Sequence, residues 1–155
     1  MRSNIPTPPH HVNRSEVLDY KTYEENRDEK RKQILAIKRL RRIHLGNYLT
    51  LLFENHDTIL YQIQEMIRVE KIVRESDIQE QIDTYNALLG KPGQLGCTLL
   101  IEITEENQRQ LLLTEWNGLQ KQIFARLPND KKIYAEYDSA QTDGRRLSAV
   151  QYLTF

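Results

Sequence analysis

The side chains best suited to chemistry in this sequence gather between Arg41 and Glu70. Carboxylates recur there, and carboxylates that a fold brings together can bind a metal ion or transfer a proton. The candidate binding residues in this stretch are Asn55, Asp57, Gln62, Glu65 and Glu70, with Glu54 as a further acidic candidate. Because the whole chain holds 22 acidic residues, the sequence singles out no catalytic pair, and we assign no metal ligand.

Glu70 is the least expected of these residues. The segment from Thr58 to about Val73 has apolar residues at helical spacing, and at about 100° per residue Glu70 falls inside the apolar stripe, close to the direction of Ile59. Either the helix is ending at Glu70 or the carboxylate pairs with a basic neighbour. The functional alternative is a carboxylate at the edge of a cleft. Gln64 and Arg68 are predicted to face water.

Lysine and arginine form a second chemical feature, a dense cluster in a chain of formal net charge +0. KRLRR spans Lys38 to Arg42, shortly after the basic residues 30–32. Cations suit the C-terminus of a helix, and the same cluster could bind an anionic group. Its candidate binding residues are Arg41 and Arg42. The cluster lacks interleaved aromatic residues and a recognisable nucleic-acid module, so we expect no nucleic-acid binding.

Other chemical motifs are absent from the sequence. The 6 glycines form no phosphate-binding loop, the serines form no nucleophile elbow, and the 4 histidines lack metal-ligand spacing. The single cysteine, Cys97, lies in an expected core strand, and its neighbours offer nothing to activate a thiol. We therefore expect no cofactor, and favour a non-catalytic protein while leaving an enzyme open.

The candidate residues must be positioned by a helix, a hairpin and a second helix. Ser15 or Asp19 can cap a helix that runs to about Lys38, whose polar middle should leave it projecting or half-docked. A three-residue hairpin loop, 46–48, pairs Leu45 with Leu49 and gathers the apolar side chains of both strands on one face. Asn55, Asp57 or Thr58 then caps the helix that carries Glu65 and Glu70.

The rest of the chain predicts an α+β fold. We expect a helix over 77–89 with a Ser76–Gln79 capping box, followed by a strand over 97–103. A further helix is expected over 105–116, with Thr104 as its cap and with Leu111, Leu112 and Trp116 facing inward. Strands over 122–127, 132–138 and 148–155 should follow, the last locked in the sheet, with a central place as one option.

These elements predict one domain over 15–155 after a flexible N-terminal arm, 1–14. We expect a mostly antiparallel sheet of about five or six strands, packed by three or four helices. No apolar run is long enough to serve as a signal or to span a membrane, so we expect a soluble, cytoplasmic protein without a membrane partner.

Three separated segments carry a family resemblance. LTLLFENHDTILYQIQEMIRVEKI with the basic run before it, LLIEIT, and the ending RLSAVQYLTF resemble an uncharacterised bacterial family, domain of unknown function 3501, from Leu18 onward. The family has no assigned reaction. The resemblance implies, by genomic association, a rubrerythrin-like protein and an iron-sulfur oxidoreductase as partners, and a role near peroxide or iron redox chemistry in oxidative stress.

Two functional hypotheses follow. The preferred one is a non-catalytic accessory or binding protein, with a homodimer as one option, that docks on a redox partner through the basic cluster and the first helix. The alternative is a small carboxylate-based metal-binding protein or enzyme at the junction of the hairpin and the following helix.

Overall fold

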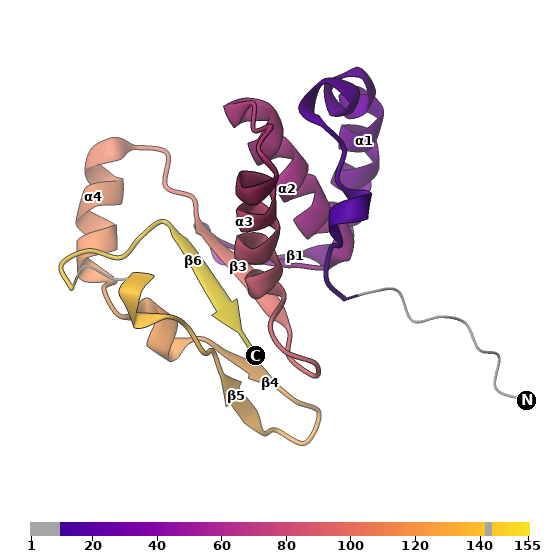
Figure 1. Cartoon of the computed structure of the whole chain (residues 1–155). Coiled ribbons are helices and arrows are strands. Elements are labelled where there is room, and N and C mark those ends of the chain that lie inside the picture. The colour runs from indigo at the N-terminus through magenta and orange to yellow at the C-terminus, as the bar shows by residue number, and fades with distance from the viewer. Residues whose placement is uncertain (1–9, 142–143) are drawn as a thin grey trace, which may run out of the picture.

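The computed structural model describes residues 10–141 and 144–155, and it has the α+β architecture that the sequence predicts (Figure 1). The helices within these residues are α1 (Tyr20–Arg41), α2 (His56–Glu70), α3 (Glu75–Asn86) and α4 (Glu106–Glu115). The strands are β1 (Arg42–Leu45), β2 (Leu49–Phe53), β3 (Gly96–Ile101), β4 (Phe124–Arg126), β5 (Lys132–Tyr134) and β6 (Val150–Thr154).

The strands are divided between two sheets, whereas a single sheet was expected. Four of them form an antiparallel sheet in the order β1-β2-β3-β6, and β4 pairs with β5 in a separate hairpin. The short strands β4 and β5 pair with each other, and the chain just after β5 meets the larger sheet at the Glu136–Thr154 bridge. β6 lies at the end of the order rather than in the centre. The chain end is nevertheless fixed, because Leu95 and Phe155 exchange backbone hydrogen bonds.

The β1–β2 hairpin confirms the predicted register. Leu45 pairs with Leu49, and His44 pairs with Thr50 across the three-residue loop. Gly46 has a φ of 60°, the left-handed conformation that glycine adopts without strain. His44 is exposed, as predicted, and its Nδ1 lies 3.0 Å from Thr50 Oγ1. β1 lies at the edge of the sheet, and all four of its residues are exposed.

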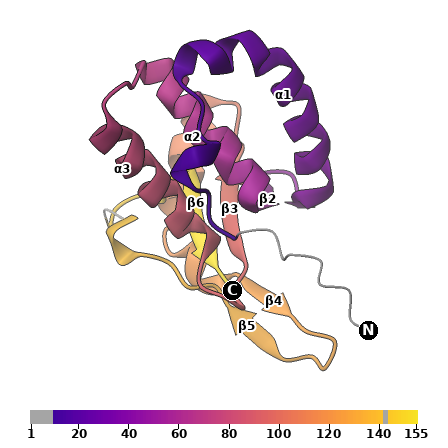
Figure 2. The same ribbon diagram turned by 45° about the vertical axis from the view of Figure 1, so that its right-hand side comes forward.

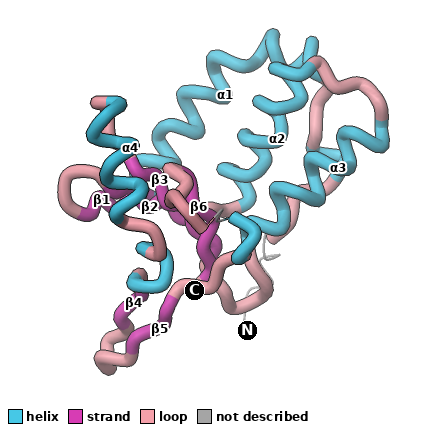
Figure 3. Tube along the Cα trace, turned by 90° about the vertical axis from the view of Figure 1, so that its left-hand side faces the viewer, coloured by secondary structure: helices cyan, strands magenta, loops and turns pink. Residues whose placement is uncertain are grey.

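The larger sheet separates two apolar cores. α1, α2 and α3 lie on one side of it, and α4 with the β4–β5 hairpin lies on the other (Figures 1 and 3). The helical core joins α2 to α3 and to the chain before α1, and it contains Val12, Val17, Ile59, Ile63, Ile67, Ile78, Ile82 and Leu89. The sheet core contains Leu51, Cys97, Leu99, Ile101, Leu113, Leu147 and Leu153, among others. Burial raises the pKa of the Cys97 thiol to about 12, as suits a core residue.

The helix boundaries differ in detail from the predicted ones. Asp19 caps α1, as predicted, by accepting from the backbone N–H groups of Lys21 and Thr22, and the helix continues to Arg41. The predicted Ser76–Gln79 capping box of α3 is wrong. The first residue of this helix is Glu75, so Ser76 lies inside the helix and cannot cap it. The Ser76 hydroxyl lies 3.2 Å from the Asp77 carboxylate instead.

The predicted cap of α4 is also wrong, and its predicted apolar face is right for Leu112 and Trp116, which pack partly buried against the sheet core, but wrong for Leu111. Its cap is Glu105 rather than Thr104, because the Glu105 carboxylate accepts from the backbone N–H groups of Asn107 and Gln108. Leu113 is fully buried while Leu111 is 66% exposed. Three consecutive leucines, 111–113, cannot all face one side of a helix, and periodicity alone did not choose among them.

The N-terminal arm expected over 1–14 falls mainly on residues 1–9, which lie outside the described residues. Its final part is packed rather than flexible. Val12 is only 3% exposed, and the short helix η1 (Arg14–Glu16) follows it. The Asn86 side chain donates to Val12 O (3.0 Å) and accepts from Val12 N (2.9 Å). The packed domain therefore starts before residue 15, and hydrophobic periodicity missed this because the buried Val12 is a single apolar residue within a polar segment.

Candidate functional site between the first two helices

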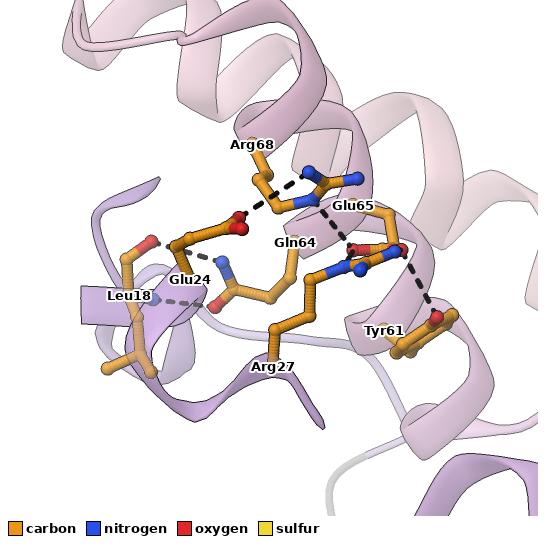
Figure 4. A network of polar contacts seen from close by, with 7 residues as sticks. All are labelled: Leu18, Glu24, Arg27, Tyr61, Gln64, Glu65 and Arg68. Carbon is orange, nitrogen blue, oxygen red and sulfur yellow. Dashed lines mark hydrogen bonds and ion pairs between the residues drawn. The ribbon is translucent and has the colours of Figure 1, made fainter. Parts of the chain in front are cut away.

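A network of charged and aromatic side chains joins α1 to α2, with Glu65 at its centre (Figure 4). Arg27 of α1 donates to both carboxylate oxygens: its Nε lies 3.2 Å from Oε1 and 3.0 Å from Oε2, and its Nη2 lies 2.8 Å from Oε1. Tyr61 donates to Glu65 Oε1 at 3.2 Å, and Arg68 donates to Oε2 at 3.3 Å. Arg68 also reaches back to Glu24 of α1, at 3.4 Å.

This network stabilises the ionised form of Glu65. The hydrogen bonds from Arg27 lower the pKa of the Glu65 carboxyl to about 2, against an opposing effect of burial. Burial, together with the charge of Glu65, raises the pKa of Tyr61. A carboxylate with so low a pKa is a poor proton acceptor near neutral pH. Because its oxygens already accept several hydrogen bonds, Glu65 is better suited to fixing α1 on α2 than to acid–base chemistry.

A cavity of about 210 Å³ lies between α1 and α2 beside this network. Its apolar lining comes from Ile34, Ile37 and Leu60, and its polar lining comes from Glu16, Tyr23, Lys30, Gln33, Asp57, Tyr61 and Gln64. The side chain of Tyr23 is buried, and its hydroxyl interacts with the Glu65 carboxylate. Burial and the nearby Glu65 charge raise the pKa of Tyr23, so its hydroxyl stays protonated.

Gln64 fixes the chain that enters α1. It is 2% exposed, although the sequence predicted that it faces water. Its side chain accepts from Leu18 N at 2.7 Å and donates to Leu18 O at 3.1 Å, as Figure 4 shows. The apolar pattern of α2 could not reveal this role, because the partner of Gln64 is the backbone of a loop.

The junction between the hairpin and α2 is also held by hydrogen bonds. The Glu54 carboxylate accepts from the hydroxyls of Thr58 and Thr98. Asn55 caps α2, as predicted, by accepting from Thr58 N at 3.0 Å. Arg41 donates to Phe53 O at 2.6 Å and to Glu54 O at 3.3 Å. The polar groups of this junction therefore hold the hairpin against α2.

The predicted site residues do not meet at one point. Glu65 lies in the network, while Asn55 and Arg41 belong to the junction. Gln62 is half-buried, and Asp57, Arg42 and Glu70 are exposed. Glu70 is the last residue of α2, in agreement with the explanation that the helix ends there. Within residues 10–141 and 144–155, no group of three or more histidine, cysteine or acidic side chains could hold a metal ion.

Sequence reasoning missed several residues that the structure brings together. Arg27 is one of ten consecutive polar residues in the first helix, and nothing local distinguishes it from its neighbours. His56 was not singled out, yet its Nε2 lies 2.9 Å from Glu16 Oε1. These partners are far apart in the chain, so the pairings become visible only in the fold.

The end of α1 and the start of β1 carry exposed residues of both apolar and basic type. We call this boundary the α1–β1 corner and define it as Arg39, Leu40, Arg42 and Ile43. Leu40 is 89% exposed, and Ile43 is 50% exposed. Arg39 and Arg42 are exposed as well. Lys38 lies apart from the corner, with its ammonium 5.1 Å from the centre of the Tyr61 ring, and burial lowers its pKa.

None of the helices in the described part of the chain is both long and apolar enough to cross a membrane. A family model described as "Protein of unknown function (DUF3501)" matches residues 11–155. A crystal structure from Burkholderia pseudomallei K96243, described as a novel protein of unknown function, is 34% identical to this chain, with a TM-score of 0.86. That similarity covers 93% of this chain and 76% of the other. No curated protein is significantly similar. Because the family model spans nearly the whole sequence, the predicted resemblance is confirmed, and the chain belongs to the DUF3501 family.

Proposed function

We propose that this protein is a non-catalytic binding protein that docks on another protein through the α1–β1 corner. The observation that carries the proposal is Leu40, which is 89% exposed close to Arg39 and Arg42. One exposed leucine is ordinary, but here Ile43 is also exposed at the same boundary between helix and strand. Arginine and large apolar side chains together are typical of the residues that contribute most to protein interfaces.

The α1–α2 network supports this proposal because it positions the helix that carries the corner. The side chains that α1 buries are Tyr23 and Ile34, so apolar packing alone would hold the helix weakly. The bidentate contact between Arg27 and Glu65 fixes the position of α1 along α2. A surface that is already ordered loses less conformational entropy when it binds.

The charge of the corner indicates the kind of partner. A complementary surface would surround an apolar recess with carboxylates. From the family resemblance, we propose a rubrerythrin-like protein or an iron-sulfur oxidoreductase as this partner, and therefore an accessory role in oxidative stress. A homodimer would need a different surface, because two facing corners would bring arginines together.

Charge reversal tests the docking surface. The double variant Arg39→Glu/Arg42→Glu should weaken binding to the partner about tenfold or more, because like charges would then face each other. Lys121→Glu/Lys131→Glu makes the same change in charge at exposed positions outside the corner and should bind like the wild type. Titration calorimetry with each purified candidate partner gives the affinities, and melting temperatures show that both variants fold. If neither candidate binds, or both variants bind equally well, the proposal fails.

The carboxylate-based alternative has less support. Glu54 and Glu65 already accept hydrogen bonds from neighbouring side chains, and a bound metal ion would have to displace these contacts. Metal analysis of gently purified protein distinguishes the two functions, since a resident ion should be stoichiometric and should raise the melting temperature.

A further inference from the structure

The two edges of the larger sheet differ in how their outward backbone groups are bonded. β6 forms one edge, and its outward groups are covered. Thr154 exchanges backbone hydrogen bonds of 2.8 and 2.9 Å with Glu136. The side-chain amide of Gln141 accepts from Tyr152 N at 2.9 Å and donates to Tyr152 O at 3.3 Å. These contacts occupy the groups that another strand would need in order to pair with β6.

β1 forms the opposite edge, and the register shows which of its backbone groups point outward. In an antiparallel sheet, successive residues of a strand direct their N–H and C=O groups alternately to its two sides. Glu54 N donates to the backbone of β3, so the even-numbered residues of β2 bond to β3 and the odd-numbered ones bond to β1. Their partners in β1 are Ile43 and Leu45. Arg42 and His44 therefore direct their backbone groups away from the sheet.

The outward groups of β1 are open. Among the described residues, no hydrogen bond reaches the backbone N–H or C=O of Arg42 or His44. All four residues of β1 are exposed. An edge strand with open backbone groups is a place where an extended chain can pair.

The side chains of β1 indicate what such a chain should carry. Ile43 and Leu45 lie on the face of the sheet that also carries Leu51 of the sheet core, and they are 50% and 46% exposed. Arg42 and His44 lie on the other face. An added strand would place apolar side chains beside the first pair and an acidic side chain beside Arg42. A strand of alternating acidic and apolar residues matches both faces.

A second copy of this chain matches the edge less well. Two β1 strands that pair antiparallel through their outward groups put Arg42 opposite His44, or put one of these residues opposite its own copy. Each arrangement brings basic side chains together, which disfavours it. Charged side chains on an edge strand oppose pairing between copies, and here they leave the edge open to an acidic partner.

We propose that the partner at the α1–β1 corner binds by adding a strand to β1, through an extended segment in which acidic and apolar side chains alternate. Strand addition rests on the proposed docking function, because Arg42 and Ile43 belong to both surfaces. The acidic residues of the segment bond to the backbone of Arg42 and His44, and its apolar residues cover Ile43 and Leu45.

Two substitutions at one position separate backbone pairing from side-chain contact. His44→Pro removes the outward N–H, and an edge strand tolerates proline where that N–H faces solvent. His44→Ala also removes the imidazole but keeps the N–H. The probe is a synthetic peptide of alternating glutamate and valine, long enough to span β1. In NMR titrations of the full chain, the wild type and His44→Ala should bind it with a Kd of about 1 mM or below. His44→Pro should bind it about 2- to 12-fold more weakly, because one hydrogen bond is lost.

A matched pair of peptides tests the same bonds without changing the protein. Methylation of the backbone nitrogens of the glutamates removes the N–H groups that would donate to β1. Methylation of the backbone nitrogens of the valines removes N–H groups that would face away from β1. The first peptide should not bind at millimolar concentration, and the second should bind like the unmethylated peptide.

Strand addition is overturned if the unmethylated peptide does not bind at millimolar concentration, if both His44 variants bind it equally, or if both methylated peptides bind equally. Melting temperatures show whether His44→Pro folds, and the methylated peptides decide by themselves if it does not. A wild-type dimer that His44→Pro dissociates, measured by analytical ultracentrifugation, would also overturn it, because a second copy would then occupy the edge.

The docking function and strand addition can fail separately. With each purified candidate partner, charge reversal of Arg39 and Arg42 tests the corner. A partner that charge reversal releases, but that binds His44→Pro and His44→Ala equally, docks at the corner without adding a strand. That result would overturn strand addition and leave the docking function in place.

Discussion

The two sides of α2 attach to their neighbours by different chemistry. Toward α3 and the chain before α1, Ile59, Ile63 and Ile67 are at most 1% exposed and pack in the helical core. Toward α1, Glu65 and Arg68 form the charged network with Arg27 and Glu24. Figure 2 shows α2 between its two neighbours.

The apolar contact supplies stability, and the charged contact supplies geometry. Apolar burial is non-directional and stabilises in proportion to the area removed from water. An ion pair that is partly exposed adds little net stability but requires a definite orientation of its partners. We therefore expect α3 to be held mainly by burial, and the position of α1 to depend more strongly on charge, pH and salt.

The largest expected effect lies on the apolar side. Ile63→Ala should lower the free energy of unfolding by about 2–5 kcal/mol, because Ile63 is completely buried and its removal leaves a cavity. Urea unfolding followed by circular dichroism measures the loss. A change as small as that of an exposed site such as Val69→Ala would show that the α2–α3 interface is less tightly packed than described.

A smaller effect is expected on the charged side. Arg27→Met should cost about 1–2 kcal/mol, because it leaves Glu65 with Arg68 as its remaining cation in the network. Adding Glu65→Met should recover most of this loss, since no unpaired carboxylate then remains at the interface. Urea unfolding of the two single variants and the double variant gives the coupling.

Glu75→Gln provides the matched control, because it removes the exposed ion pair with Arg14 and should leave unfolding unchanged. Strict additivity of the Arg27 and Glu65 substitutions would contradict the idea that these residues act together.

The smallest expected effect appears on acidification. The pKa of Glu65, about 2, lies below its ordinary value of 4.5, so the folded state resists protonation. Its stabilisation is complete above the ordinary value and is lost as the pH falls from about 4.5 to about 2. Solvent screening of this partly exposed pair reduces the contribution to about 1 kcal/mol.

Glu65→Gln is the comparison protein for acidification. Other carboxyl groups with lowered pKa values, such as Glu16 and Asp19, destabilise both proteins equally on acidification. The wild type should lose about 1 kcal/mol more than Glu65→Gln between about pH 5 and about pH 2, measured by urea unfolding. Equal losses would show that Glu65 does not act through its charge.

Local patterns predicted much of the fold. Gly46 and the alternation around it predicted the hairpin register, and the caps that form, Asp19 and Asn55, were each among the alternatives predicted. Such features depend on residues close together in sequence. The division into two sheets could not be predicted, because it depends on which strands meet in space.

The candidate site was predicted only in part. Glu65 was named, but its partner Arg27 comes from a different helix and the role of Gln64 depends on backbone atoms of a loop. Glu70 was placed inside the apolar stripe because the helix was assumed to continue to about Val73, whereas α2 ends at Glu70. A sequence pattern thus identifies which residues are unusual before it can identify what they contact.

Two side-chain amides form hydrogen bonds with the backbone before α1. These bonds limit how this segment can evolve. Gln64 holds Leu18, and Asn86 holds Val12, each through both the N–H and the C=O of one residue. Any amino acid except proline offers these two groups, so at either position most replacements would keep the hydrogen bonds. Inserting or deleting one residue between Val12 and Leu18 would instead carry one of them out of reach. The segment should therefore tolerate changes of composition more readily than changes of length.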